Sequence, residues 1–266
     1  MKTVFVTFAD NKYKKSLIRI EDEVKRFSCF TDFFFFQEKD IEKNYLKIIK
    51  PWFYRRGYGY WRWKPYFVKK VLDKLDEGDV LIWSDAGCIL NSGAEEILLH
   101  YIEMARSCKS GFFVFEQKQI EREWTKNDLF EYLQTDYDDR NSGQFWAGAW
   151  IVVKTNLSQD VIDQWYDICR NHEDLVTDKR SETPNDENFQ EHRWDQSVFS
   201  LVVKATDDYV SIPYTKDKSK PIIGARKKEP TRLVRLIQYL LLPWRIMLGL
   251  YLKYGKGFYF KNKMAW

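Results

Sequence analysis

The stretch "VLIWSDAGCIL", residues 80–90, is an apolar run that stops at a single acid, Asp85, passes two small residues and turns apolar again. Residues 80–84 have the β-branched and aromatic content of a buried strand. Ligands of open α/β sheets bind outside the carboxyl ends of the strands. Asp85 is therefore expected at a binding edge; the alternative is an acid that caps the following turn.

The residues after Asp85 leave space beside its carboxylate. Ala86 adds little bulk, and Gly87 permits close backbone approach or an unusual φ. An acid with such space can hold a hard divalent cation that bridges two phosphates.

The rest of the body alternates between strand and helix patterns. Strands are expected at residues 3–9, 32–36, 80–84, 111–115 and 145–154. Helices are expected at 16–27, 64–75, 93–106, 127–133, 158–169 and 195–203, the first capped by Ser16 and the second with Pro65 in its first turn. This alternation predicts an α/β sandwich around a mostly parallel sheet. The polar segment 171–190 is expected to be a mobile surface loop or lid.

Composition is that of a globular chain with one main domain. It has 266 residues, 44% of them hydrophobic, and 17% aromatic residues, which serve either an aromatic core or stacking surfaces. Four cysteines without a CxxC pair suggest neither a zinc site nor a disulfide framework, and fit a reducing cytoplasm. The N-terminal sequence does not read as a signal peptide.

Charge divides the chain into a body, 1–225, and a tail, 226–266. The tail has ten basic residues and one acidic residue, a net charge of +9, whereas the body has 33 basic and 38 acidic residues. Leucines at helical spacing, aromatic residues and lysines in the tail favour a basic amphipathic segment at an anionic membrane interface. The alternative is a helical pair packed on the body.

Four blocks of the body carry a family resemblance. The string "GDVLIWSDAGCILN" (78–91) is similar to the strand that ends in the DXD motif of GT-A glycosyltransferases. "GYGYWRWKP" (57–65), "QFWAGAWIVVKT" (144–155) and "EHRWDQSVFSLVV" (191–203) resemble segments of bacterial enzymes that make lipopolysaccharide, capsule or exopolysaccharide. The blocks occur in the expected order over residues 1–225. The departure is Gly87, where the DXD pattern has a second acid.

This resemblance implies a GT-A fold and a set of site residues. Asp85 would hold Mn²⁺ or Mg²⁺ against the diphosphate of a nucleotide sugar, and the catalytic pair would be Asp195 and Gln196, beneath the anomeric carbon. The alternative for this pair is a helix N-terminus, with Asp195 favoured by the dipole. The expected donor-binding residues are Asp10, Trp61, Arg62, Lys64, Asp85 and Gly87, and the expected acceptor or phosphate residues are Gln144, Trp146 and His192.

Several of these residues also have a structural or a different catalytic explanation. Trp61 and Trp63 would share one side of an extended segment, with Arg62 and Lys64 on the other, and core packing is the alternative for the rings. Glu191 is a candidate base for an inverting reaction. His100 and His172 are expected to be structural.

The leading hypothesis is transfer of a hexose from a UDP-sugar, with retention, to a glycan or lipid-linked acceptor in bacterial surface polysaccharide synthesis. It places the protein in the cytoplasm, peripheral on the inner face of the plasma membrane, with no nucleic-acid partner. One alternative is a nucleic-acid or polyanion binder that uses "RRGYGYWRWK" and the tail. Another is an inactive GT-A-like scaffold.

Overall fold

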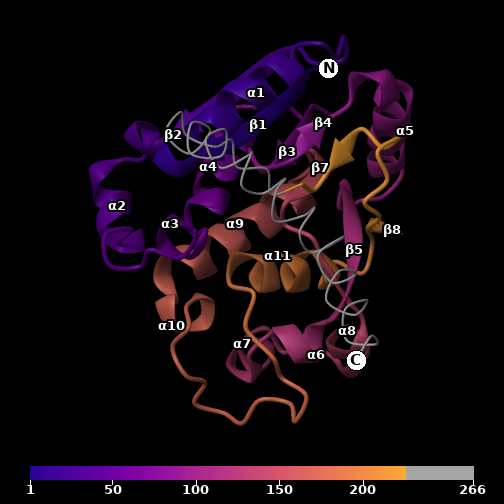
Figure 1. Ribbon diagram of the computed structural model, residues 1–266. Coiled ribbons are helices and arrows are strands. Elements are labelled where there is room, and N and C mark those ends of the chain that lie inside the picture. The colour runs from indigo at the N-terminus through magenta and orange to yellow at the C-terminus, as the bar shows by residue number, and fades with distance from the viewer. Residues whose placement is uncertain (226–266) are drawn as a thin grey trace, which may run out of the picture. The chain divides into compact units, whose positions relative to one another are not determined.

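The computed structural model describes residues 1–225, so the prediction for the 226–266 tail lies outside the described residues. These residues form a seven-stranded sheet with helices on both faces, beside a two-stranded sheet of β4 and β9 (Figure 1). The strands are β1 (Thr3–Ala9), β2 (Asp32–Gln37), β3 (Val80–Ser84), β4 (Ile89–Leu90), β5 (Phe112–Ile120), β6 (Gly143–Phe145), β7 (Ala149–Val153), β8 (Val210–Pro213) and β9 (Ile222–Ile223).

Eleven α-helices and three short 3₁₀ turns complete the described part of the chain. The α-helices are α1 (Lys14–Val24), α2 (Lys43–Ile49), α3 (Gly57–Tyr60), α4 (Trp63–Leu72), α5 (Glu95–Arg106), α6 (Glu121–Trp124), α7 (Asn127–Leu133), α8 (Tyr137–Asn141), α9 (Asn156–Asn171), α10 (Glu173–Val176) and α11 (Asp195–Lys204). The 3₁₀ turns are η1 (Asn11–Tyr13), η2 (Glu38–Asp40) and η3 (Ser92–Ala94). Among the described residues, no helix is long and apolar enough to cross a bilayer.

The large sheet has the order β2-β1-β3-β7-β5-β6, with β8 added to β5. β1 pairs in parallel with β2 and β3, and β5 pairs in parallel with β8. β7 is antiparallel to both β3 and β5, and β6 is antiparallel to β5. The remaining strands all run in one direction, which confirms the mostly parallel sheet expected from the alternating pattern.

Alternate strand residues build two hydrophobic cores. Val6, Trp83 and Trp150 face α4, α9 and α11, whereas Phe5 and Ile82 face α1 and α5. Successive side chains on a strand point to opposite faces, and both faces are covered, so the strands read as continuous apolar runs. Much of the high aromatic content is therefore core, as one of the two expectations had it.

Several element boundaries differ from the sequence prediction, and two of the differences have a local cause. Asp10 accepts hydrogen bonds from the backbone N–H groups of Lys12 and Tyr13 and starts η1, so α1 begins at Lys14 and the predicted cap at Ser16 is wrong. The single strand expected at 145–154 is two strands, β6 and β7, because the chain turns between them.

The irregular segment 177–194, which joins α10 to α11 and runs past α7 in Figure 1, is fastened to the body. The buried Lys126 ammonium donates to three backbone carbonyl oxygens, those of Asp174 (2.7 Å), Thr177 (2.8 Å) and Lys179 (2.9 Å). The Asp128 carboxylate accepts from the backbone of residues 182 and 183. That this segment acts as a lid stays a prediction.

Candidate active site

The sheet has a topological switch point between β1 and β3. From β1 the chain first adds β2 on one side and later β3 on the other, and all three strands are parallel. In sheets of this kind ligands bind outside the carboxyl ends of the strands where the direction of winding reverses. Asp10 follows β1 and Asp85 follows β3, so these two acids flank the point where a ligand is expected.

Asp85 is held by both its backbone and its side chain. Its N–H donates to the carbonyl oxygen of Gly148 (2.8 Å), and its own carbonyl accepts from the N–H of Cys88 (2.9 Å). Its Oδ1 accepts from Trp83 Nε1 (3.1 Å) and lies 3.1 Å from Lys64 Nζ. The side chain is 35% exposed, so the strand ends on an acid that is both paired and open to solvent. Gly87 has no positive φ, so the unusual backbone geometry considered for it in the sequence is not present.

Lys64 joins Asp85 to Asp195. It stands in the first turn of α4 and is only 2% exposed. Its ammonium lies 3.1 Å from Asp85 Oδ1 and 3.2 Å from Asp195 Oδ2, and donates to the Ala147 carbonyl oxygen at 2.9 Å. Burial lowers the pKa of this ammonium, but the charges of Asp195 and Asp85 outweigh it, so the pKa is raised and the group is charged. One hydrogen bond and two ion pairs occupy this ammonium, which fits a clamp inside the site better than a direct diphosphate ligand.

Asp195 is the first residue of α11 and is 3% exposed. Burial raises the pKa of this carboxyl to about 7, with Lys64 opposing the rise and Asp85 adding to it. Its Oδ2 is within ion-pair distance of the ammonium but is not aligned for a hydrogen bond. Near neutral pH, Asp195 is therefore divided between its charged and protonated forms.

Gln196, next along α11, is partly exposed and anchored by two other amides. Its Nε2 donates to Gln117 Oε1 (3.0 Å) and Gln144 Oε1 (2.6 Å), and its Oε1 accepts from the Ala147 N–H (3.4 Å). Gln144 is fully buried, so the structure gives it the position of a support for Gln196 rather than an acceptor contact. Gln117, on β5, was not identified from the sequence; its only signal is a polar residue late in a strand.

A buried ion pair beneath Gln144 was also not identified from the sequence. Glu121 Oε2 accepts from Gln144 Nε2 (3.0 Å), and Glu121 Oε1 lies 3.0 Å from Lys204 Nζ. Glu121 and Lys204 are 0% and 1% exposed. The available signal was helical spacing: Ser197, Ser200 and Lys204 place polar atoms on one face of an otherwise apolar helix.

The segment before Lys64 is not extended, which corrects the expected alternation of rings and cations. Gly57 to Trp61 all have positive φ, a left-handed turn that the two glycines make accessible. A Cβ at Gly57 would lie 2.2 Å from the Trp61 ring, and a Cβ at Gly59 would lie 2.7 Å from a backbone oxygen. The Trp61 ring stacks on Trp194 with centroids 5.0 Å apart.

Arg62 and His192 lie in the interior. The Arg62 guanidinium donates to the carbonyl oxygens of Arg170 (3.1 Å) and Ile48 (3.2 Å), so its donors are used within the fold. His192 is buried and its Nδ1 accepts from the Lys126 N–H (3.3 Å). Burial, followed by the charge of Lys126, lowers its pKa well below 6.5, so this imidazole is neutral at pH 7 and lacks the charge to attract a phosphate.

The other expected residues lie nearer the edge. Asp10 is partly exposed, and burial raises its pKa. Trp146 is partly exposed, with its ring 4.6 Å from that of Tyr214. Glu191 Oε1 accepts from Arg56 (2.6 Å), which occupies the carboxylate proposed as a base.

A divalent cation fits this site only in a limited way. Within residues 1–225 no three or more His, Cys, Asp or Glu side chains gather to hold a metal. Asp85 makes its contacts with Lys64 and Trp83 through Oδ1, so Oδ2 is the oxygen that could take a cation. Mg²⁺ in phosphate sites is commonly held by one or two carboxylates, with water and substrate phosphates as the other ligands.

Comparison with known proteins gives distant structural likenesses. No protein-family model and no curated protein matches this chain. A glycosyltransferase involved in the glycosylation of the major capsid of PBCV-1 is similar at 8% identity, over 80% of this chain and 82% of that one, with a TM-score of 0.44. Galactosyltransferase LgtC, in complex with donor and acceptor sugar analogs, is similar at 11% identity, over 79% and 73%, with a TM-score of 0.42.

The glycosyltransferase GlyE of Streptococcus pneumoniae TIGR4 is similar at 14% identity and a TM-score of 0.40, over 80% of this chain and 45% of that one. This chain therefore spans less than half of GlyE. Likenesses at these identities concern the fold and not the reaction.

Proposed function

We propose that this protein is a glycosyltransferase that moves a sugar from a nucleoside diphosphate to a glycan acceptor. The observation that carries the proposal is the Lys64 ammonium, which joins Asp85 and Asp195 at the switch point of the sheet. Two carboxylates and one ammonium give a cluster with a net negative charge when Asp195 is ionised. Such a cluster favours the positive charge that develops at an anomeric carbon during glycosyl transfer.

The residues of the cluster have different access to a substrate. Asp85 and Gln196 are partly exposed, so they are the groups assigned to the donor: the carboxylate near the diphosphate and the amide at the sugar hydroxyls. Asp195 is buried and paired with Lys64, so it acts on the substrate through its charge and not by direct contact. A divalent cation bound at Asp85 would supply charge compensation for the leaving diphosphate.

Finer parts of the proposal rest on the sequence blocks. They are a UDP-linked hexose as donor, retention of configuration, and a glycan or lipid-linked acceptor of bacterial surface polysaccharide. The proposal also includes a cytoplasmic location, with the 226–266 tail on the inner face of the membrane. The polyanion binder is disfavoured, because Arg62 and Lys64 are buried and Arg56 pairs with Glu191 (2.6 Å).

The test is release of free nucleotide from a panel of nucleotide sugars, with Mn²⁺ or Mg²⁺ present or removed by chelation. Asp85→Asn should lower turnover about a hundredfold, because it removes the carboxylate that would hold the cation compensating the leaving diphosphate. The matched control is Asp73→Asn, an exposed acid at the end of α4, which should keep normal turnover. The proposal fails if no nucleotide sugar is turned over and UDP with either cation does not raise the melting temperature.

A further inference from the structure

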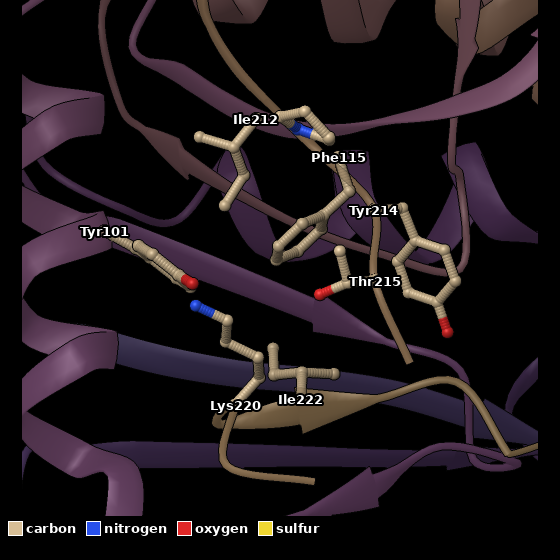
Figure 2. A pocket seen from close by; sticks show the side chains of 8 residues that line it. Tyr101, Phe115, Ile212, Tyr214, Thr215, Lys220 and Ile222 are labelled. Atoms are coloured by element: carbon tan, nitrogen blue, oxygen red, sulfur yellow. The ribbon is translucent and has the colours of Figure 1, made fainter. Parts of the chain in front are cut away.

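A cavity of about 290 Å³ lies on the α5 face of the sheet (Figure 2). Its walls come from α5, β5, β8, the loop after β8, and β9. Tyr101, Phe115 and Tyr214 give it aromatic walls, and Ile212 and Ile222 make it apolar elsewhere. A volume of this size suits a single ring rather than an extended ligand.

The polar groups of the cavity gather at one side. Figure 2 shows the Tyr101 hydroxyl and the Lys220 ammonium directed toward each other, with the Thr215 hydroxyl beside the Phe115 ring. Tyr101 is 5% exposed, and its hydroxyl has no hydrogen-bond partner. Buried hydroxyl groups without a partner are uncommon in folded proteins, so this one is available to a ligand in the cavity.

The charges of the residues that line the cavity narrow the chemical class of its ligand. Lys220 is the only charged residue among those that line the cavity, and none of them is acidic. An ammonium and two hydroxyl groups around an aromatic wall suit a ring that carries an acidic group and its own hydroxyls. A neutral apolar ring would leave the Tyr101 hydroxyl unpaired, and a cation would meet Lys220.

Trp146 connects this cavity to the candidate active site. Its ring lies 4.6 Å from Tyr214 and 6.2 Å from Phe115, both of which line the cavity. The same ring packs against Gly148, where a Cβ would lie 2.3 Å from its Nε1. The Gly148 carbonyl accepts the N–H of Asp85, so one aromatic side chain separates the cavity from the Asp85 turn.

We infer that the cavity binds one pyranose ring that carries a carboxylate, as the acidic sugar of the acceptor. The aromatic walls contact the face of the ring, the Lys220 ammonium pairs with the carboxylate, and the Tyr101 hydroxyl donates to it. The role as acceptor rests on the proposed transferase function. Binding of the acidic sugar does not, and can be measured without any donor.

The test is titration of the full chain with methyl glucuronide and with methyl glucoside, followed by saturation-transfer NMR and calorimetry. The glucuronide should bind at least about tenfold more tightly, because a charge-assisted contact is involved. Lys220→Met should remove this preference, and Tyr101→Phe should weaken glucuronide binding several-fold. The matched control is Lys218→Met, which changes an exposed lysine two residues away and should bind as the wild type does.

Several results would overturn the inference: equal affinity for the two sugars, no binding of the glucuronide, or equal losses in Lys218→Met and Lys220→Met. Melting temperatures of all variants establish that each is folded. Glucuronide binding without any donor turnover would leave the cavity assigned and defeat the transferase proposal, whereas donor turnover without glucuronide binding would do the reverse.

Discussion

Replacing Lys64 by methionine should be strongly destabilising. Methionine keeps much of the side-chain volume but removes the charge that lies 3.1 Å from Asp85 and 3.2 Å from Asp195. Asp85 remains partly solvated, whereas Asp195 loses its counter-charge, so above pH 7, where wild-type Asp195 is ionised, the variant must keep a buried unpaired carboxylate or take up a proton. Breaking a buried ion pair from one side costs about 3–5 kcal/mol. At about 2–4 °C per kcal/mol for a chain of this size, the melting temperature should fall by roughly 6–20 °C.

The assay is urea unfolding at pH 9, where wild-type Asp195 is ionised, followed by circular dichroism, with Lys69→Met as the control. Lys69 is on the same helix and also contacts two acids, Asp73 and Asp163, but its side chain is 28% exposed. That variant should lose less than about 1 kcal/mol. Adding Asp195→Asn to Lys64→Met should recover most of the lost stability, because the uncompensated charge is gone. Equal losses in the two lysine variants, or no recovery in the double variant, would refute the reasoning.

Two further predictions concern stability. Because burial raises the pKa of Asp195 to about 7, above its value of 3.8 in the unfolded chain, its contribution is full in acid and is lost as pH rises through 7. The difference in unfolding free energy between wild type and Asp195→Asn should therefore fall by roughly 2–3 kcal/mol from pH 5 to pH 8, and a flat difference would contradict the assignment. Gly59→Ala, at φ +93° and 2.7 Å from a backbone oxygen, should cost at least about 2 kcal/mol by urea unfolding. Gly93→Ala, at a glycine without positive φ, should cost clearly less, and equal costs would argue against the left-handed turn.

Local patterns predicted most of the fold, because alternation and apolar runs are short-range properties. β3 has the predicted bounds, and α7 and α11 begin at the predicted residues. The turn that divides β6 from β7 was missed, because "FWAGAW" is apolar throughout and only tertiary contacts show where the chain bends.

The candidate site was predictable in part. Asp85 could be identified because it interrupts an apolar strand, and Lys64 and Asp195 because they begin helices that follow recognisable blocks. The sequence could not show that the Lys64 ammonium joins Asp85 and Asp195, since the three residues are far apart along the chain. Arg62 was assigned to the donor as a cation near Lys64, yet its N–H groups donate to carbonyl oxygens in the interior. Glu121 and Lys204 were missed because charged residues are rarely buried without a partner, and the partner is 83 residues away.

The Lys126 ammonium restrains the segment before Asp195 through main-chain oxygens alone. Every amino acid carries such an oxygen, so side chains at the restrained positions can change without loss of the contact. Homologues should then be free to change the side chains at positions 177 and 179 while keeping a lysine at the position of Lys126. A substrate-specific surface could therefore diversify at these positions while the start of α11 keeps its place in the fold.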